Sequence, residues 1–129
     1  MIALDTNILI RYLLAGQDKE TGRARRLIET DLSGDQQGHV TAITLCEIIW
    51  VLRNRYKFGI DAQIAVVRLM LDSAQLYIEH DDCAHAALEC GHADLADALI
   101  HFIGNKRGCT KTVTFDRKFA RLDGVELLQ

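Results

Sequence analysis

Short apolar runs alternate with longer amphipathic segments along the chain. Strand-like runs of apolar residues predict β-strands over residues 1–4, 39–42, 76–79, 109–115 and 125–128. Apolar positions three or four residues apart predict helices over residues 8–14, 19–31, 44–56, 62–71, 82–90 and 94–106, with a short helical turn at 117–121. Because strands that alternate with helices build a sheet covered on both faces, the pattern predicts a three-layer α/β/α sandwich around a central, mainly parallel sheet.

Two of these helices have the clearest apolar stripes. The stripe of the helix at 44–56 is formed by Leu45, Ile48, Ile49, Leu52 and Tyr56, and that of the helix at 94–106 by Leu95, Ala98, Leu99, Phe102 and Ile103. We expect Asp61 to cap the helix at 62–71, and the glycines at 91 and 108 to end the helices before them.

The composition is that of an ordinary globular protein. The chain has 129 residues, of which 49% are hydrophobic and 26% charged, which predicts a single domain over residues 1–129. The formal net charge is −3, so any contact with nucleic acid has to rest on a local basic patch or on metal ions. No apolar run is long enough to span a bilayer, and the first residues are unlike a secretory signal, so we expect a cytoplasmic protein. The four cysteines lack Cys-x-x-Cys spacing and are expected to be reduced core residues.

Two acidic residues directly follow predicted strands. Asp5 ends the first apolar run, and the carboxyl ends of strands in open α/β sheets are where ligands and metals bind. An Asp-Thr-Asn sequence also forms side-chain-to-backbone hydrogen bonds readily, so a turn residue is the alternative for Asp5. Asp116 follows the strand at 109–115 in the same way, and its alternative role is to cap the short helix after it.

Three further acids lie on predicted helices. Glu47 fits a capping box with Thr44, although the same position near a helix start could also point into a cleft. Asp94 and Asp97 share a helix face, where two carboxylates repel unless a cation is present. Asp94 alone is typical of a helix cap, whereas Asp97 interrupts an apolar run in which a charge is costly without a partner. His101 shares the same face.

Taken together, the acids indicate a site for a hard cation. Mg²⁺ and Mn²⁺ prefer oxygen ligands, usually a few carboxylates together with water and substrate phosphate. We therefore expect metal-assisted phosphodiester chemistry. A zinc site made from Cys83, His85, Cys90 and His92 is not expected, because helix positions two apart point to nearly opposite sides.

Basic residues could supply phosphate contacts, although most are expected to form only a solvated face. The candidates are Arg11, Arg53, Arg55, Lys57, Lys106, Arg107, Lys111, Arg117, Lys118 and Arg121. Because Arg117 and Lys118 directly follow Asp116, they are the basic residues that we most expect to lie beside the acids. The aromatic content of 6% does not strongly indicate base stacking.

Four segments carry a resemblance to a known family. The chain resembles the PIN domain, and over its whole length the VapC-type toxins, in the segments at 2–7, 43–47, 93–100 and 113–116. The segments occur in the family's order and at its spacing. The resemblance implies an α/β/α sandwich and an Mg²⁺- or Mn²⁺-dependent ribonuclease.

The resemblance also implies partners. VapC-type toxins are neutralised by a cognate antitoxin, which inserts a segment into the active site and binds operator DNA through its other half. They usually form homodimers. The implied partners are therefore RNA, an antitoxin and a second copy of the chain, with no membrane.

The acids of the family carry over residue by residue. Asp5, Glu47, Asp97 and Asp116 match the four family acids and are the expected catalytic residues. Of these, Asp5, Asp97 and Asp116 are the expected metal ligands for one or two cations, and Glu47 either binds metal or orients the attacking water. Asp94 matches an additional acid of a subset and is a weaker candidate. The expected residues near substrate or metal are Asn7, Thr114, Arg117 and Lys118. His101 stands where many members have a small residue.

Two other functions fit part of the pattern. A phosphatase of the haloacid dehalogenase type also begins with a strand that ends in Asp, but its chemistry needs a second Asp at the position of Asn7. A catalytically inactive PIN-like scaffold could act as a binding partner only. Mutually repelling carboxylates disfavour this second alternative.

Overall fold

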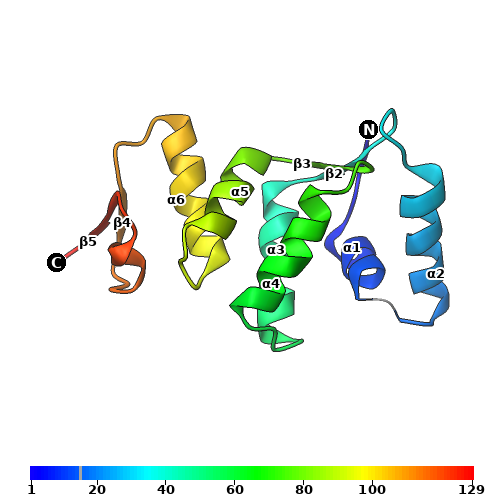
Figure 1. Ribbon diagram of the computed structural model, residues 1–129, viewed down its shortest axis with the longest axis horizontal. Coiled ribbons are helices and arrows are strands. Elements are labelled where there is room, and N and C mark those ends of the chain that lie inside the picture. The colour runs from blue at the N-terminus through cyan, green and yellow to red at the C-terminus, as the bar shows by residue number, and fades with distance from the viewer. Residues whose placement is uncertain (15) are drawn as a thin grey trace. The chain divides into compact units, whose positions relative to one another are not determined.

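The computed structural model describes residues 1–14 and 16–129 (Figure 1), and its first half contains three parallel strands with four α-helices. The elements of the first half are β1 (Ile2–Ala3), α1 (Thr6–Leu13), α2 (Lys19–Arg26), the π-helical turn η1 (Leu27–Asp31), β2 (Gly38–Val40), α3 (Ala42–Asn54), α4 (Ile60–Leu71) and β3 (Leu76–Ile78). The second half contains α5 (Asp81–Glu89), α6 (Leu95–Arg107), β4 (Thr112–Thr114), the 3₁₀ turn η2 (Phe119–Arg121) and β5 (Val125–Leu127).

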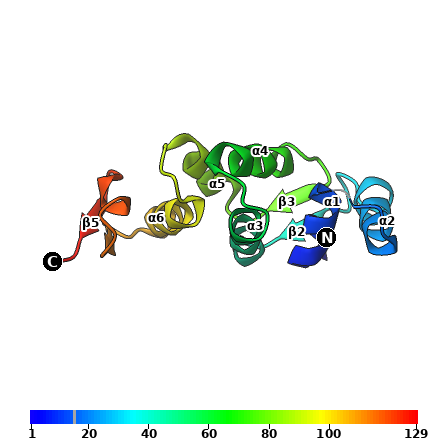
Figure 2. The same cartoon turned by 90° about the horizontal axis from the view of Figure 1, so that it is seen from below.

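These elements form two compact units, Met1–Glu79 and His80–Gln129. In the first unit the strands pair in the order β1-β2-β3, with both pairs parallel. Figure 2 shows α3 and α4 alongside strands β2 and β3. The core of this unit includes the fully buried side chains of Leu9, Ile28, Val40, Leu45, Ile48, Leu52, Val67 and Met70.

The second unit pairs two helices with two strands. Strands β4 and β5 are parallel, with Thr112 opposite Val125 and Thr114 opposite Leu127. Helix α5 packs against α6. The buried apolar residues of this unit are Cys83, Ala84, Ala87, Leu88, Leu95, Ala98, Leu99, Phe119 and Val125. All strand pairs between described residues are parallel, as the sequence pattern predicts, whereas a single domain over 1–129 stays a prediction.

Three predicted helix starts, those of α1, α3 and α4, are two residues too late, since these helices begin at Thr6, Ala42 and Ile60. Helix α3 begins at Ala42, because the Thr41 hydroxyl accepts a hydrogen bond from the Thr44 amide at 3.1 Å and so acts as the N-cap. The predicted capping box of Thr44 and Glu47 is therefore absent. Helix α4 begins at Ile60 after Gly59, so Asp61 lies in the first turn and is not the cap.

Backbone conformation and burial test several other local predictions. Gly91 and Gly108 follow α5 and α6 with φ of 80° and 102°, the left-handed conformation that glycine adopts most readily. Tyr56 lies beyond the end of α3 and is 47% exposed, so it does not belong to the buried stripe. All four cysteines are free, but of these only Cys83 is a buried core residue, whereas Cys46 and Cys90 are half-buried and Cys109 is exposed. None of the described helices is long and apolar enough to cross a membrane.

Candidate functional site

The first unit places Asp5 at the start of α1, directly after β1. Asp5 is the N-cap residue of α1, yet its side chain makes no capping hydrogen bond, and the residue is exposed. The alternative of a turn residue held by its own side chain is therefore not what the structure shows. The carboxylate is left available at the positive end of a helix, where a negative charge is stabilised.

Glu47 lies close to the same helix start. The hydroxyl of Thr6, the residue after Asp5, donates a hydrogen bond to Glu47 Oε1 at 3.1 Å. Glu47 is exposed on α3, one turn inside the helix, and does not cap it. The first unit thus brings two of the four predicted acids to the N-terminus of α1, although 41 positions separate the hydrogen-bonded residues.

The second unit brings together three more acids. Asp94 caps α6, and its Oδ1 accepts a hydrogen bond from the Asp97 amide at 3.0 Å, so the capping role considered for Asp94 is confirmed. Asp97 is in the first turn, and its side chain is 27% exposed. Burial raises the pKa of Asp97, and the negative charges of Asp94 and, more weakly, Asp116 raise it further. This corner of the molecule therefore holds negative charge that is incompletely compensated.

Asp97 has one partner that opposes this effect. His92 Nε2 lies 3.4 Å from Asp97 Oδ2, and this contact lowers the pKa of Asp97. The side chain of His92 is only 10% exposed, and its ring stacks on buried Phe119 with centroids 5.3 Å apart. Sequence reasoning considered His92 only as an improbable zinc ligand, because nothing in the local sequence indicates a contact with Phe119.

Asp116 lies two residues beyond the end of β4 and organises the turn there. Its Oδ1 accepts hydrogen bonds from the amides of Lys118 at 2.8 Å and Phe119 at 3.2 Å. Thr114 Oγ1 accepts a hydrogen bond from the Asp116 amide at 3.0 Å, and this bond fixes the turn to the last residue of β4. The N-cap residue of η2 is Lys118, so Asp116 does not cap this helix as the alternative expected; its side chain instead binds the amides of the turn that leads into η2. Arg117 and Lys118 are exposed.

His101 does not contact the acids. It is buried in the second unit, with Nδ1 at 2.8 Å from Thr112 Oγ1 and Nε2 at 3.1 Å from Asn105 Nδ2. Both ring nitrogens therefore have partners, and the side chain connects α6 to β4. The glycine at 124 leaves room for the ring, because a Cβ there would come within 2.9 Å of His101 Cε1.

Comparison with known families gives a match over almost the whole chain. The family model of the PIN domain matches residues 2–125. The chain belongs to the PIN-domain family. No curated protein matches it. PIN domains are typically metal-dependent nucleases, and membership implies an RNA substrate and confirms the predicted α/β/α fold class. It also sets aside the haloacid dehalogenase alternative.

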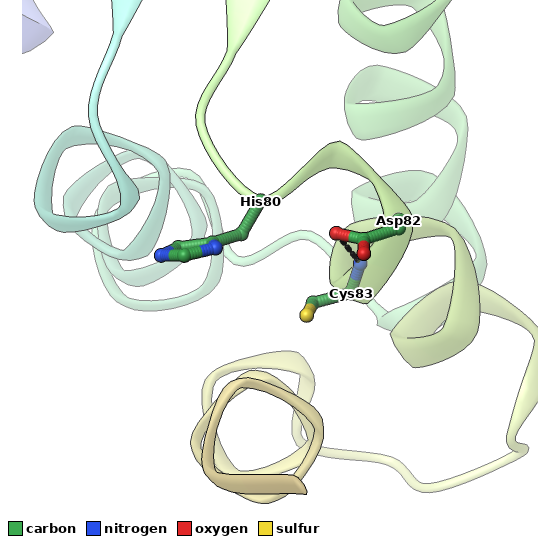
Figure 3. A group of neighbouring side chains, drawn as sticks. All are labelled: His80, Asp82 and Cys83. Carbon is green, nitrogen blue, oxygen red and sulfur yellow. Dashed lines mark hydrogen bonds between the residues drawn. The ribbon is translucent and has the colours of Figure 1, made fainter. Parts of the chain in front are cut away.

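The PIN domain contains a second group of possible ligands, which sequence reasoning missed. Among the described residues, the only three ligand atoms of His, Cys, Asp or Glu within 4.8 Å of one another belong to His80, Asp82 and Cys83 (Figure 3). Asp82 Oδ1 already accepts hydrogen bonds from the Cys83 amide at 2.9 Å and from Lys106 Nζ at 3.0 Å. Burial raises the pKa of the Cys83 thiol, which opposes the thiolate that a metal needs. We therefore do not assign the family's metal to this group.

The cysteines and histidines that were excluded as a zinc site each have different surroundings. Cys90 Sγ donates to the Ala87 carbonyl at 3.3 Å, and His85 is exposed on α5. His92 faces Asp97, as described above. The PIN domain thus has acids at two places, Asp5 with Glu47 in the first unit and the three acids near Asp97 in the second. Their convergence into one site stays a prediction.

Proposed function

We propose that this PIN domain is an Mg²⁺- or Mn²⁺-dependent endoribonuclease of the VapC type, the toxin of a toxin–antitoxin pair. The observation that carries the nuclease proposal is the state of Asp97. A carboxylate inside an apolar helix, with a pKa raised by burial and by two neighbouring acids, is costly in the metal-free protein. A divalent cation relieves this cost.

The donor set fits such a cation. The candidate ligands are carboxylates, which are the oxygen ligands that Mg²⁺ and Mn²⁺ prefer. Asp5, Asp97 and Asp116 would hold the metal, with Asp94 in a weaker role because one of its oxygens caps α6. When bound, the metal lowers the pKa of a water molecule and neutralises charge that develops on the phosphate.

The protein's own residues position this chemistry. Thr6 holds Glu47 at the start of α1, where Glu47 serves as a ligand or orients the attacking water. His92 holds one oxygen of Asp97, and Thr114 fixes the turn that presents Asp116. Asn7, Arg117 and Lys118 are exposed and available to the substrate. Attack by water leaves a 5′-phosphate and a 3′-hydroxyl and does not use the RNA 2′-hydroxyl as nucleophile.

The proposed partners follow from the family resemblance. They are an RNA substrate, a cognate antitoxin that blocks the site and links it to operator DNA, and a second copy of the chain in a homodimer. We propose that the protein acts in the cytoplasm. An inactive scaffold remains the second candidate, and it predicts no cleavage.

Expression in cells tests the toxin role. We expect induction of the wild-type chain to arrest growth and to produce new RNA ends, and the Asp5→Asn variant to do neither at equal protein level. Glu126→Gln is a matched control, because Glu126 is an exposed acid of β5 that pairs with Lys111 and is not one of the proposed ligands. Equal growth of wild type and Asp5→Asn would contradict the proposal.

A further inference from the structure

The first unit contains a polar cleft whose lining residues, apart from Asn7, have no part in the proposed function. It has a volume of about 430 Å³ and is lined mainly by polar groups from α1, from the start of α2 and from the end of α3. The residues that matter here are Asn7, Arg11, Leu14, Asp18, Arg55 and Tyr56. The volume is at the lower part of the range of small-molecule sites, so the cleft suits one small polar group with an attached ring.

The cleft begins beside the proposed catalytic acids. Asn7 lies two positions after Asp5 in the first turn of α1, and Arg11 follows about one helical turn later. Arg55 ends α3, about two helical turns beyond Glu47 on the same helix. A ligand in the cleft would therefore contact α1 and α3. These are the same two helices that position Asp5 and Glu47.

The two arginines in the cleft differ in their partners. Arg11 is bound by Asp18 Oδ2 at 2.6 Å from Nη1 and lies near Glu20, whose Oε2 is 3.0 Å from Nε. Arg55 is exposed and makes no ion pair with any other described residue. A guanidinium with free donors binds phosphate in a bidentate manner, so Arg55 is the residue suited to an incoming phosphate.

An aromatic ring lies next to this arginine. Tyr56 is 47% exposed, and its ring contacts Phe58 edge-on, with centroids 6.3 Å apart. Because Tyr56 is exposed, part of the residue remains accessible to a ligand. Bases of single-stranded RNA stack on exposed aromatic rings, while arginine binds the backbone.

We propose that this cleft binds one nucleotide of the RNA strand that flanks the cleaved bond, with Arg55 on its phosphate and Tyr56 against its base. The proposal rests on the proposed nuclease function for the identity of the ligand. It extends that function by naming residues that hold the substrate without taking part in hydrolysis. The ion-paired Arg11 and Asp18 also line the cleft.

Binding to uncleaved RNA tests the proposal separately from catalysis. The Asp5→Asn variant is mixed with a fluorescently labelled single-stranded RNA, and anisotropy gives the dissociation constant at several salt concentrations. Adding Arg55→Ala or Tyr56→Ala is expected to weaken binding about tenfold or more. Arg55→Ala is also expected to reduce the salt dependence of binding, because one phosphate contact is lost.

Arg68→Ala is the matched control, since Arg68 is exposed on α4 and does not line the cleft. Circular dichroism checks that each variant is folded. Unchanged affinity in both cleft variants, or an equal loss in Arg68→Ala, overturns the proposal, as does an absence of RNA binding by Asp5→Asn. An absence of RNA cleavage by the wild type would instead contradict the nuclease function. The effect of Arg55→Ala and Tyr56→Ala on RNA binding would still decide whether the cleft binds RNA.

Discussion

At the scale of single residues, Asp97 is the most informative position. It lies in the first turn of α6, where its pKa is raised by burial first and by Asp94 and Asp116 after that. His92 is the partner that keeps this carboxylate in place, and Phe119 in turn holds His92 by stacking. A purely structural network gains nothing from two further acids beside a half-buried carboxylate, whereas a cation site needs such a cluster.

The Asp97→Asn substitution is expected to stabilise the metal-free protein. A raised pKa means that the folded state binds the Asp97 proton more tightly than the unfolded state, so stability falls as pH rises through the window between the unfolded pKa and the raised folded pKa. Above that window the charged carboxylate costs stability, which Asn removes. The melting temperature at pH 7 without metal should be higher for Asp97→Asn, and the difference should shrink in acid. A lower melting temperature for Asp97→Asn at pH 7 would favour a structural role.

His92 is expected to act on metal binding through Asp97. Partners that orient a metal ligand typically change metal affinity by about 10- to 100-fold when they are removed. Titration with Mn²⁺ by calorimetry should show a loss in this range for His92→Ala, with part of the affinity restored by His92→Gln, which keeps a donor. His85→Ala is the control, because His85 is exposed on α5. Equal affinities of wild type and His92→Ala would exclude this role.

At the scale of elements, α3 shows what local patterns can and cannot predict. Its buried positions Leu45, Ile48, Ile49 and Leu52 follow the predicted stripe. Its start was misjudged because Thr41 and Thr44 are both good capping residues, and only the strand before them decides which one lies outside the helix. Once Thr41 is the cap, Glu47 is released from the capping box and is able to accept the Thr6 hydroxyl.

The cap of α3 gives a prediction for stability. Thr41→Ala removes the acceptor for the Thr44 amide and should destabilise the fold by about 1 kcal/mol. Thr30→Ala, at an exposed position of η1, should change stability by less than about 0.5 kcal/mol. Urea unfolding of both variants measures the difference. An effect of Thr41→Ala no larger than that of Thr30→Ala would show that the cap contributes nothing measurable.

At the scale of the whole molecule, the order of helices and strands follows from periodicity. The four acidic positions come from residue type and from the family resemblance, and their joint role stays a prediction. The contacts between distant segments do not follow from periodicity, because they depend on packing that no local pattern encodes. The Thr6–Glu47 hydrogen bond, the stacking of His92 on Phe119 and the link from His101 to Thr112 belong to this class. The 66% exposure of Leu69 on α4 belongs to the same class, because it depends on which residues pack against α4.

The central claim is that acids from both halves of the chain serve one metal-dependent ribonuclease. Its most direct test is incubation of the purified protein with RNA and Mn²⁺, followed by chemical identification of the new RNA ends. The account predicts 5′-phosphate and 3′-hydroxyl ends with the wild type and with Glu126→Gln, and no cleavage by Asp5→Asn, by Asp97→Asn or after chelation of the metal. Cleavage that persists in both Asp variants, or ends that carry a 2′,3′-cyclic phosphate, would contradict it.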